Sequence, residues 1–200
     1  MHSKTVSFRK MEDGTREDYR LLDESERNYA AGLPLRVLQA LRKLDYSLEG
    51  YAISRLQHCL QAATRAMDER ADEELIVAAL LHDIGDELAP YNHAEIAAGI
   101  LRPYVRPEVT WIVAHHEIFQ RYYYVHHLGG NRHAREAFRH HVWYKSCVAF
   151  CEKWDQTSFD PDYPTWPLQV FEPLVMKVLS RAPHDARYTA PKITEEITGE

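Results

Sequence analysis

Histidine and aspartate recur in this sequence beside apolar helical patterns, and their side chains are the nitrogen and oxygen donors that bind divalent metals. The clearest example is His82-Asp83, which follows the nearly uninterrupted apolar run EELIVAALL at residues 73–81. Such a run predicts a buried helix, here 73–83, with both polar residues inside the protein. A buried carboxylate is costly unless it is paired or binds a cation, and an imidazole-ligated cation would satisfy both residues.

Further donors accompany this pair. If the pair stood alone, a structural role would be favoured, with Asp83 capping a helix or pairing with an arginine and His82 hydrogen-bonded in the core. Other candidates lie on or at the edge of predicted helices: His58, His93, His116 and Asp155. Four imidazoles and two carboxylates suit iron, manganese or zinc. Six ligands are too many for one closed site, whereas two metals about 3.5–4 Å apart, bridged by a carboxylate, would use them all.

The elements that must position these donors are predicted to be helices, because apolar residues recur at three- and four-residue steps and no segment alternates with period two. The fold class is therefore all-α. We expect one domain over residues 16–183, with the ligand-bearing core at 46–160, a weakly ordered lead-in at 1–15 and a C-terminal tail at 184–200. The predicted helices are 17–31, 35–44, 52–67, 73–83, 92–104, 107–127, 132–141, 144–154 and 168–181.

Composition limits the partners. The 200 residues are 45% hydrophobic and 27% charged, with a formal net charge of −6, so no basic surface for nucleic acid is expected. No apolar stretch approaches the length of a membrane span, and the N-terminal residues do not form a secretory signal, which predicts a cytoplasmic protein acting on small molecules. The three cysteines, Cys59, Cys147 and Cys151, are predicted to pack in the core.

The donor set resembles a known family. His58, His82-Asp83 and Asp155 resemble the H…HD…D signature of the HD-domain superfamily, and His93 with His116 resembles its dinuclear branch. Over roughly residues 46–155 the chain is similar to the mixed-valent diiron oxygenases of the myo-inositol oxygenase and organophosphonate oxygenase group. Nearly end to end, it also resembles uncharacterised proteins labelled predicted HD phosphohydrolases. The segments that carry the oxygenase resemblance are ISRLQHCLQAA, VAALLHDIGD, NHAEIAAGILRPYV, HHEIFQRYY and KWD.

This resemblance implies an HD-domain helical bundle with extra N-terminal helices and a defined ligand assignment. One metal is held by His58, His82 and Asp155, the other by His93 and His116, and Asp83 bridges them. The implied cofactor is an Fe(II)/Fe(III) pair, with manganese or zinc as alternatives. His115 is the competing ligand for His116, which is preferred because the arginine of QRYY then falls five residues later, as in the oxygenases.

Departures from the oxygenase pattern concern the residues expected to meet substrate. The position after H-D-x-G, commonly lysine or histidine in the oxygenases, is Asp86 here. An aspartate would repel a phosphonate, although it would accept an ammonium or a polyol hydroxyl. The relatives also carry a tyrosine and a glutamate before the first histidine that close over the site. Their counterparts, at altered spacing, are expected among Tyr46, Glu49 and Tyr51.

The function implied by the resemblance is a diiron oxygenase that uses O₂ to cleave a small hydroxylated substrate, with amino- and phosphonate-bearing compounds among the options. The alternative is a metal-dependent phosphohydrolase or phosphodiesterase acting on a phosphate ester or nucleotide. A third hypothesis is a binding module that kept the fold without catalysis. The complete donor set argues against it, because buried Asp83 and Asp155 would be costly without metal.

Overall fold

The structure is a computed structural model that describes residues 5–46 and 49–190, and over these residues its regular elements are all helical. The predicted all-α class is therefore confirmed. The α-helices are α1 (Arg16–Ala31), α2 (Leu33–Lys43), α3 (Arg55–Asp68), α4 (Glu73–Leu81), α5 (His93–Leu101), α6 (Pro107–Tyr124), α7 (Tyr144–Phe150), α8 (Leu168–Leu179) and α9 (Ala186–Thr189). The shorter elements are the 3₁₀ helices η1 (Met11–Asp13), η2 (Leu44–Tyr46), η3 (Val125–Leu128) and η4 (Ala134–Phe138), and the π-helix η5 (Cys151–Asp155).

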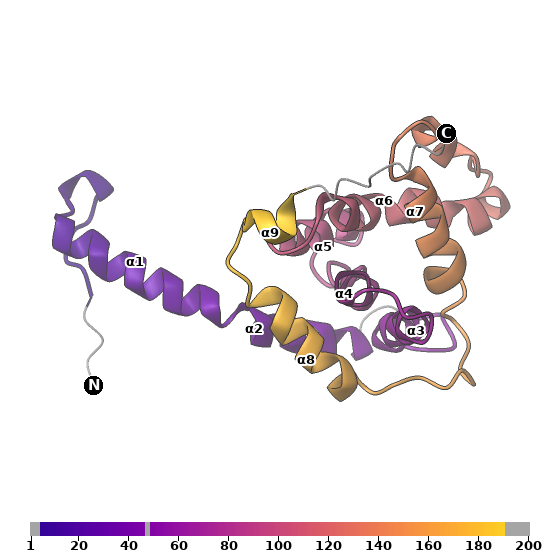
Figure 1. Cartoon of the computed structure of the whole chain (residues 1–200), viewed down its shortest axis with the longest axis horizontal. Coiled ribbons are helices and arrows are strands. Elements are labelled where there is room, and N and C mark those ends of the chain that lie inside the picture. The colour runs from indigo at the N-terminus through magenta and orange to yellow at the C-terminus, as the bar shows by residue number, and fades with distance from the viewer. Residues whose placement is uncertain (1–4, 47–48, 191–200) are drawn as a thin grey trace, which may run out of the picture.

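Helix α4 lies at the centre of the bundle (Figure 1), as its apolar sequence predicts. Its N-cap is Asp72, whose side chain accepts hydrogen bonds from the backbone amides of Glu74 and Leu75. Helix α3 packs along one side of it, and α6 and α8 contact it as well, while α5 packs against α6. The residues of the turn that follows α4 therefore lie in the middle of the molecule.

Four predicted helices differ from the observed elements in local geometry. The helix expected at 107–127 ends at Tyr124 and continues as the 3₁₀ segment η3. The helix expected at 73–83 ends at Leu81, and His82 and Asp83 lie in the turn after it. The helix expected at 132–141 is only the 3₁₀ segment η4. The helix expected at 144–154 changes from α to π geometry at Cys151. Apolar periodicity reports which residues are buried, but it does not distinguish these tighter and wider turns from α-helix.

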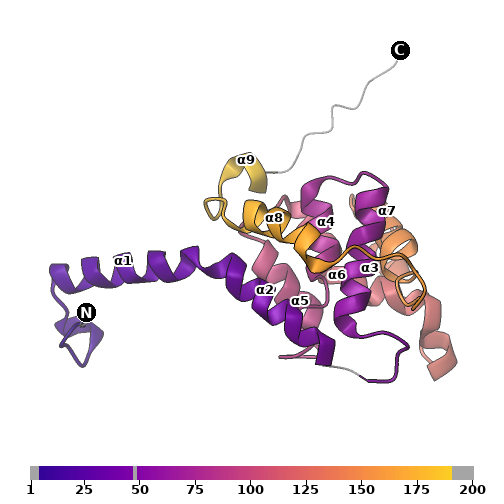
Figure 2. The ribbon, with the colours of Figure 1, turned by 90° about the horizontal axis from the view of Figure 1, so that it is seen from below.

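The two N-terminal helices supply the extra elements implied by the resemblance. Helix α1 begins with a capping box between Thr15 and Asp18 and has no buried residue. Helix α1 points away from the bundle (Figure 2). Helix α2 packs on the bundle through Val37, Leu38 and Leu41. At the other end, the predicted tail contains the short helix α9, and residues 191–200 lie outside the described part of the chain.

The cysteine prediction is confirmed, because Cys59, Cys147 and Cys151 are buried free thiols. Their burial in apolar surroundings raises the pKa of Cys59 and of Cys151. Across the described residues, the helices are too short or too polar to cross a membrane.

A buried ion-pair network ties the start of α4 to the loop before α6 and to the end of α8. The Glu74 carboxylate accepts hydrogen bonds from the backbone amide and Nη1 of Arg106, at 3.0 and 3.1 Å, and from Nη1 of Arg181, at 2.6 Å. Arg106 is itself buried. Removing one partner of such a network leaves the other charges buried and unpaired.

Replacing Glu74 with alanine should therefore lower the free energy of unfolding by about 3–5 kcal/mol. The measurement is urea denaturation, with the exposed Glu24→Ala in α1 as the matched control, expected to change stability by less than about 0.5 kcal/mol. Equal stability of the two variants would show that the network contributes nothing.

Candidate metal centre

Six donor side chains from five separate elements converge beneath the end of α4. His58 comes from α3, His82 and Asp83 from the turn after α4, and His93 is the first residue of α5. The remaining two are His116 of α6 and Asp155, the last residue of η5. All are buried except His93, which is partly exposed.

Asp83 lies between two pairs of imidazoles. Its Oδ1 is 3.3 Å from Nε2 of His116 and 3.4 Å from Nε2 of His93. Its Oδ2 is 3.5 Å from Nε2 of both His58 and His82. Asp155 joins the second pair, because its Oδ1 lies 3.4 Å from Nε2 of His58 and 3.7 Å from that of His82. The donors thus form two groups that share one carboxylate.

The four imidazoles are held in the same orientation. Each Nδ1 lies within hydrogen-bond distance of a backbone carbonyl, which can only accept, so Nδ1 carries the proton and Nε2 faces the centre. This arrangement is characteristic of metal-ligating histidines. The carbonyls are those of Ser158 for His58 (2.8 Å), Ala79 for His82 (2.8 Å), Pro90 for His93 (2.9 Å) and Val113 for His116 (2.7 Å).

The donor atoms are arranged to bind metal ions and are poor hydrogen-bond partners for one another. The Nε2 atoms of His58 and His82 are 3.0 Å apart, and those of His93 and His116 are 3.2 Å apart. When both imidazoles of a pair are neutral and protonated at Nδ1, their Nε2 lone pairs are directed at each other. Asp155 Oδ2 is buried and has no hydrogen-bond partner among the residues that the structure describes. A cation in each group would satisfy these atoms, since buried polar atoms are otherwise paired.

Electrostatics keeps the central carboxylate ionised. Burial favours the neutral acid, but the neighbouring His82 and the hydrogen bond to His116 hold the pKa of Asp83 well below its usual range. Burial lowers the pKa of His82 to about 4. For His116, the hydrogen bond to Asp83 outweighs burial and raises the pKa to about 9. The carboxylates of the candidate metal centre therefore carry negative charge that protons or metal ions must balance.

The π-helix η5 places Asp155. The backbone amide of Gln156 bonds to the carbonyl of Cys151 at 2.9 Å, one residue further back than in an α-helix. The wider turn leads into Ser158, whose hydroxyl donates to the carbonyl of Trp154 and whose own carbonyl fixes His58. Phe159 then stacks on the His58 ring at 4.4 Å.

Gly85 permits the close approach of α5. A Cβ at this position would lie 2.5 Å from the carbonyl oxygen of His93 and 2.7 Å from its Cα. Contacts this short with backbone atoms require the chain to shift. Gly85 therefore sets the position of one candidate ligand.

A cavity of about 310 Å³ adjoins the donors, a size suited to a small ligand. Sequence reasoning missed several of its lining residues, although the spacing of residues 116, 117, 120 and 124 along α6 would have grouped some of them on one helix face. Besides Asp83, His93, His116 and Asp155, the lining residues are Tyr51, Arg55, Glu117, Gln120, Tyr123, Tyr124, Gln156 and Phe159.

The expected substrate-contacting residues are distributed unevenly. Tyr51 lines the cavity and stacks on Phe159 at 5.1 Å. Tyr46 is 90% exposed and Glu49 is exposed, and neither lines the cavity. Asp86 also lies outside the lining.

Asp86 lies outside the cavity lining, in contact with Arg55 and with the candidate ligand His93. Its Oδ2 is 2.7 Å from Nε of Arg55, and its Oδ1 is 3.3 Å from Nδ1 of His93. Burial and the nearby Asp83 raise the pKa of Asp86. Arg55 also donates from Nη1 to Asp83 Oδ2 at 2.9 Å. The guanidinium therefore joins the central carboxylate to Asp86.

His115 points away from the centre. Its ring stacks on Trp111 at 4.2 Å, and its Nδ1 donates to the Trp111 carbonyl at 2.8 Å. Only the next residue, His116, reaches Asp83. The geometry thus supports the preference for His116.

Comparisons with known proteins bear on the family that the chain resembles. Residues 55–142 match the family model for the HD domain, which confirms the resemblance seen in the sequence. Over 92 residues the chain is 33% identical to [1-hydroxy-2-(trimethylamino)ethyl]phosphonate dioxygenase (glycine-betaine-forming) of Leisingera caerulea. That match covers 40% of this chain and 47% of the relative, so the chain aligns with about half of the relative's length.

Removal of the shared carboxylate tests the ligand assignment. If the six donors hold two metals, Asp83→Ala and His82→Ala should each lose both of them and about 3–5 kcal/mol of stability, because metal binding and folding are coupled. Metal content per chain is measured by elemental analysis, with the exposed His133→Ala as the control that keeps both. Unchanged metal content in Asp83→Ala would refute the bridging role.

Gly85→Ala should displace His93 and reduce occupancy of the His93–His116 group more than that of the other. Gly99→Ala is the matched control, because a Cβ there meets nothing within 4 Å. In a helix this second change should stabilise by about 0.5–1 kcal/mol. Metal stoichiometry and unfolding free energy measure both effects, and full occupancy in Gly85→Ala would contradict the prediction.

Proposed function

We propose, on the premise that residues 55–142 form an HD domain, that this protein is a dinuclear metal enzyme that uses O₂ to cleave a small hydroxylated substrate oxidatively. The observation that carries the proposal is the position of Asp83, whose two oxygens each face a different pair of imidazole Nε2 atoms. Such a shared carboxylate suits a pair of metals.

The proposed ligands follow the two donor groups. His58, His82 and Asp155 hold one metal, His93 and His116 hold the other, and Asp83 bridges them. Nitrogen and oxygen donors without thiolate are compatible with iron, and they equally accept manganese or zinc. The similarity to a relative named as a dioxygenase favours iron over zinc, because zinc is not redox-active.

Two iron ions would supply a Lewis acid for the substrate hydroxyl and a redox-active site for O₂, whose reduction would take its remaining electrons from the substrate that is cleaved. The residues of the chain do the positioning. Backbone carbonyls fix the imidazoles, Arg55 holds Asp83, and the stacked rings of Tyr51 and Phe159 cover the His58 side of the centre. The small cavity confines the substrate beside the donors and limits the water around it.

Hydrolysis of a phosphate ester is the competing chemistry for the same donors. It is less well supported by the cavity, because the one lining arginine, Arg55, is already paired with Asp83 and Asp86. Among the described residues, the rest of the lining provides no lysine or arginine to bind phosphate oxygens.

The test is the identity of the metals. Protein purified under argon should contain two irons per chain and, after partial oxidation, give the EPR signal of a coupled Fe(II)/Fe(III) pair. Two manganese ions together with turnover of a generic phosphodiester would overturn the oxygenase proposal in favour of the hydrolase.

A further inference from the structure

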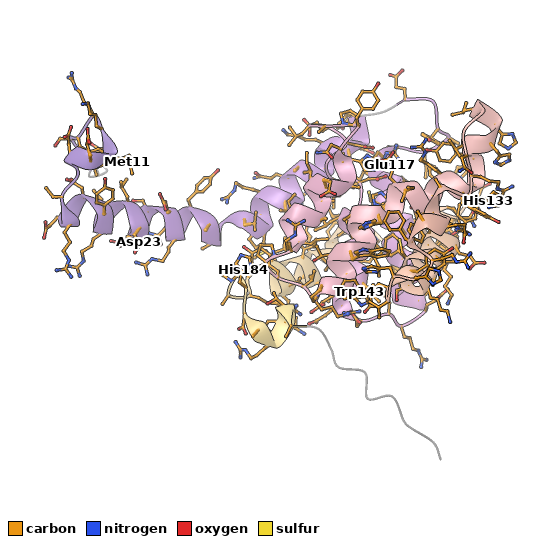
Figure 3. All side chains as sticks on the ribbon, turned by 90° about the horizontal axis from the view of Figure 1, so that it is seen from above. Met11, Asp23, Glu117, His133, Trp143 and His184 are labelled. Carbon is orange, nitrogen blue, oxygen red and sulfur yellow. The ribbon has the colours of Figure 1, made fainter. Side chains whose placement is uncertain are left out.

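The wall of the cavity formed by α6 carries three polar side chains on one helix face. Glu117 follows the donor His116, and Gln120 and Tyr124 lie three and seven residues further on, so all three face the same side. Figure 3 shows Glu117 on the bundle rather than on the projecting α1, where Asp23 lies. A substrate beside the metals would therefore have its other end against this wall.

The charge of this wall is negative. Glu117 forms no ion pair with any of the described residues. Arg55, the one lining arginine, is held by Asp83 and Asp86. A carboxylate facing a partly enclosed cavity without a counter-ion attracts a cation and repels an anion.

The neighbouring amide needs a hydrogen-bond donor. Gln120 Oε1 is buried and has no hydrogen-bond partner among the described residues. Buried acceptors of this kind are normally satisfied by protein, water or ligand. Because the Glu117 carboxylate and this amide oxygen both accept, the group that meets them must carry N–H or O–H bonds.

Aromatic rings complete the surroundings. Tyr51, Tyr123, Tyr124 and Phe159 line the same cavity. The faces of such rings attract ammonium groups. Taken with the cavity volume of about 310 Å³, this favours a cation of few atoms.

We propose that the substrate is a small amino alcohol, and this inference rests on the proposed function. Its hydroxyl lies at the metal centre, and its protonated amine donates hydrogen bonds to Glu117 and Gln120. The trimethylamino group named for the Leisingera caerulea relative has no N–H to donate, and a phosphonate would be repelled by Glu117. Glu117 and Gln120 are thus specificity residues that distinguish this chain's substrate from that of the relative.

The experiment is calorimetric titration of the holoenzyme under argon, where turnover lacks its oxidant, with three probes. Ethanolamine offers a hydroxyl and an N–H ammonium, choline a hydroxyl and a cation without N–H, and hydroxymethylphosphonate a hydroxyl and an anion. Ethanolamine should bind at least about tenfold more tightly than either of the others.

Variants test the assigned residues. Glu117→Gln should weaken ethanolamine binding about tenfold and strengthen hydroxymethylphosphonate binding, a reversal that general loosening of the site would not produce. Gln120→Leu should weaken ethanolamine binding about fivefold. Glu26→Gln in the exposed helix α1 has the same charge change and should alter neither affinity.

The proposal is overturned if ethanolamine does not bind, if choline or the phosphonate binds as tightly, or if Glu117→Gln keeps the wild-type preference. Iron content and EPR of the same samples separate this inference from the proposed function. Two irons with a preference for phosphonate would overturn only the substrate class. A preference for ethanolamine without an iron pair would overturn only the oxygenase.

Discussion

The structure depends on one buried carboxylate shared by four imidazoles. Asp83 is almost fully buried, and its two oxygens face different histidine pairs at 3.3–3.5 Å. Such a charge is tolerated in a protein interior only with compensating partners. Because the surrounding elements carry these partners, the elements must be held in fixed positions. The four backbone carbonyls that orient the imidazoles and the guanidinium of Arg55 fulfil that requirement.

Irregular backbone geometry is concentrated around this carboxylate. The helix α4 stops at Leu81 so that His82 and Asp83 enter a turn, and the π-helix η5 carries Asp155 at its end. Gly85 lets α5 approach within contact of that turn. A regular helix would direct neighbouring side chains about 100° apart, so these local departures are what allow donors from five elements to meet.

Helix α6 joins the metal donors to the cavity. One face of it presents His116 to Asp83 and, further along, Glu117 and Gln120 to the space beside the centre. The spacing between the donor His116 and the polar side chains of the cavity wall is therefore set by one helix. Substitutions at Glu117 and Gln120 can therefore change what the cavity binds without changing the candidate metal ligands.

The sequence by itself determined the all-α class, the buried α4, the core cysteines and the residue types of all six candidate ligands. These follow from apolar periodicity and from the cost of burying histidine and aspartate, which are properties of single segments. The tertiary structure alone decided that Asp86 pairs with Arg55 behind His93, that Tyr46 lies outside the cavity, and that Phe159 covers His58. It also decided the π-turn before Asp155. The reason is physical: periodicity describes which side of an element is buried, whereas the partner that a side chain meets depends on packing between segments distant in the sequence.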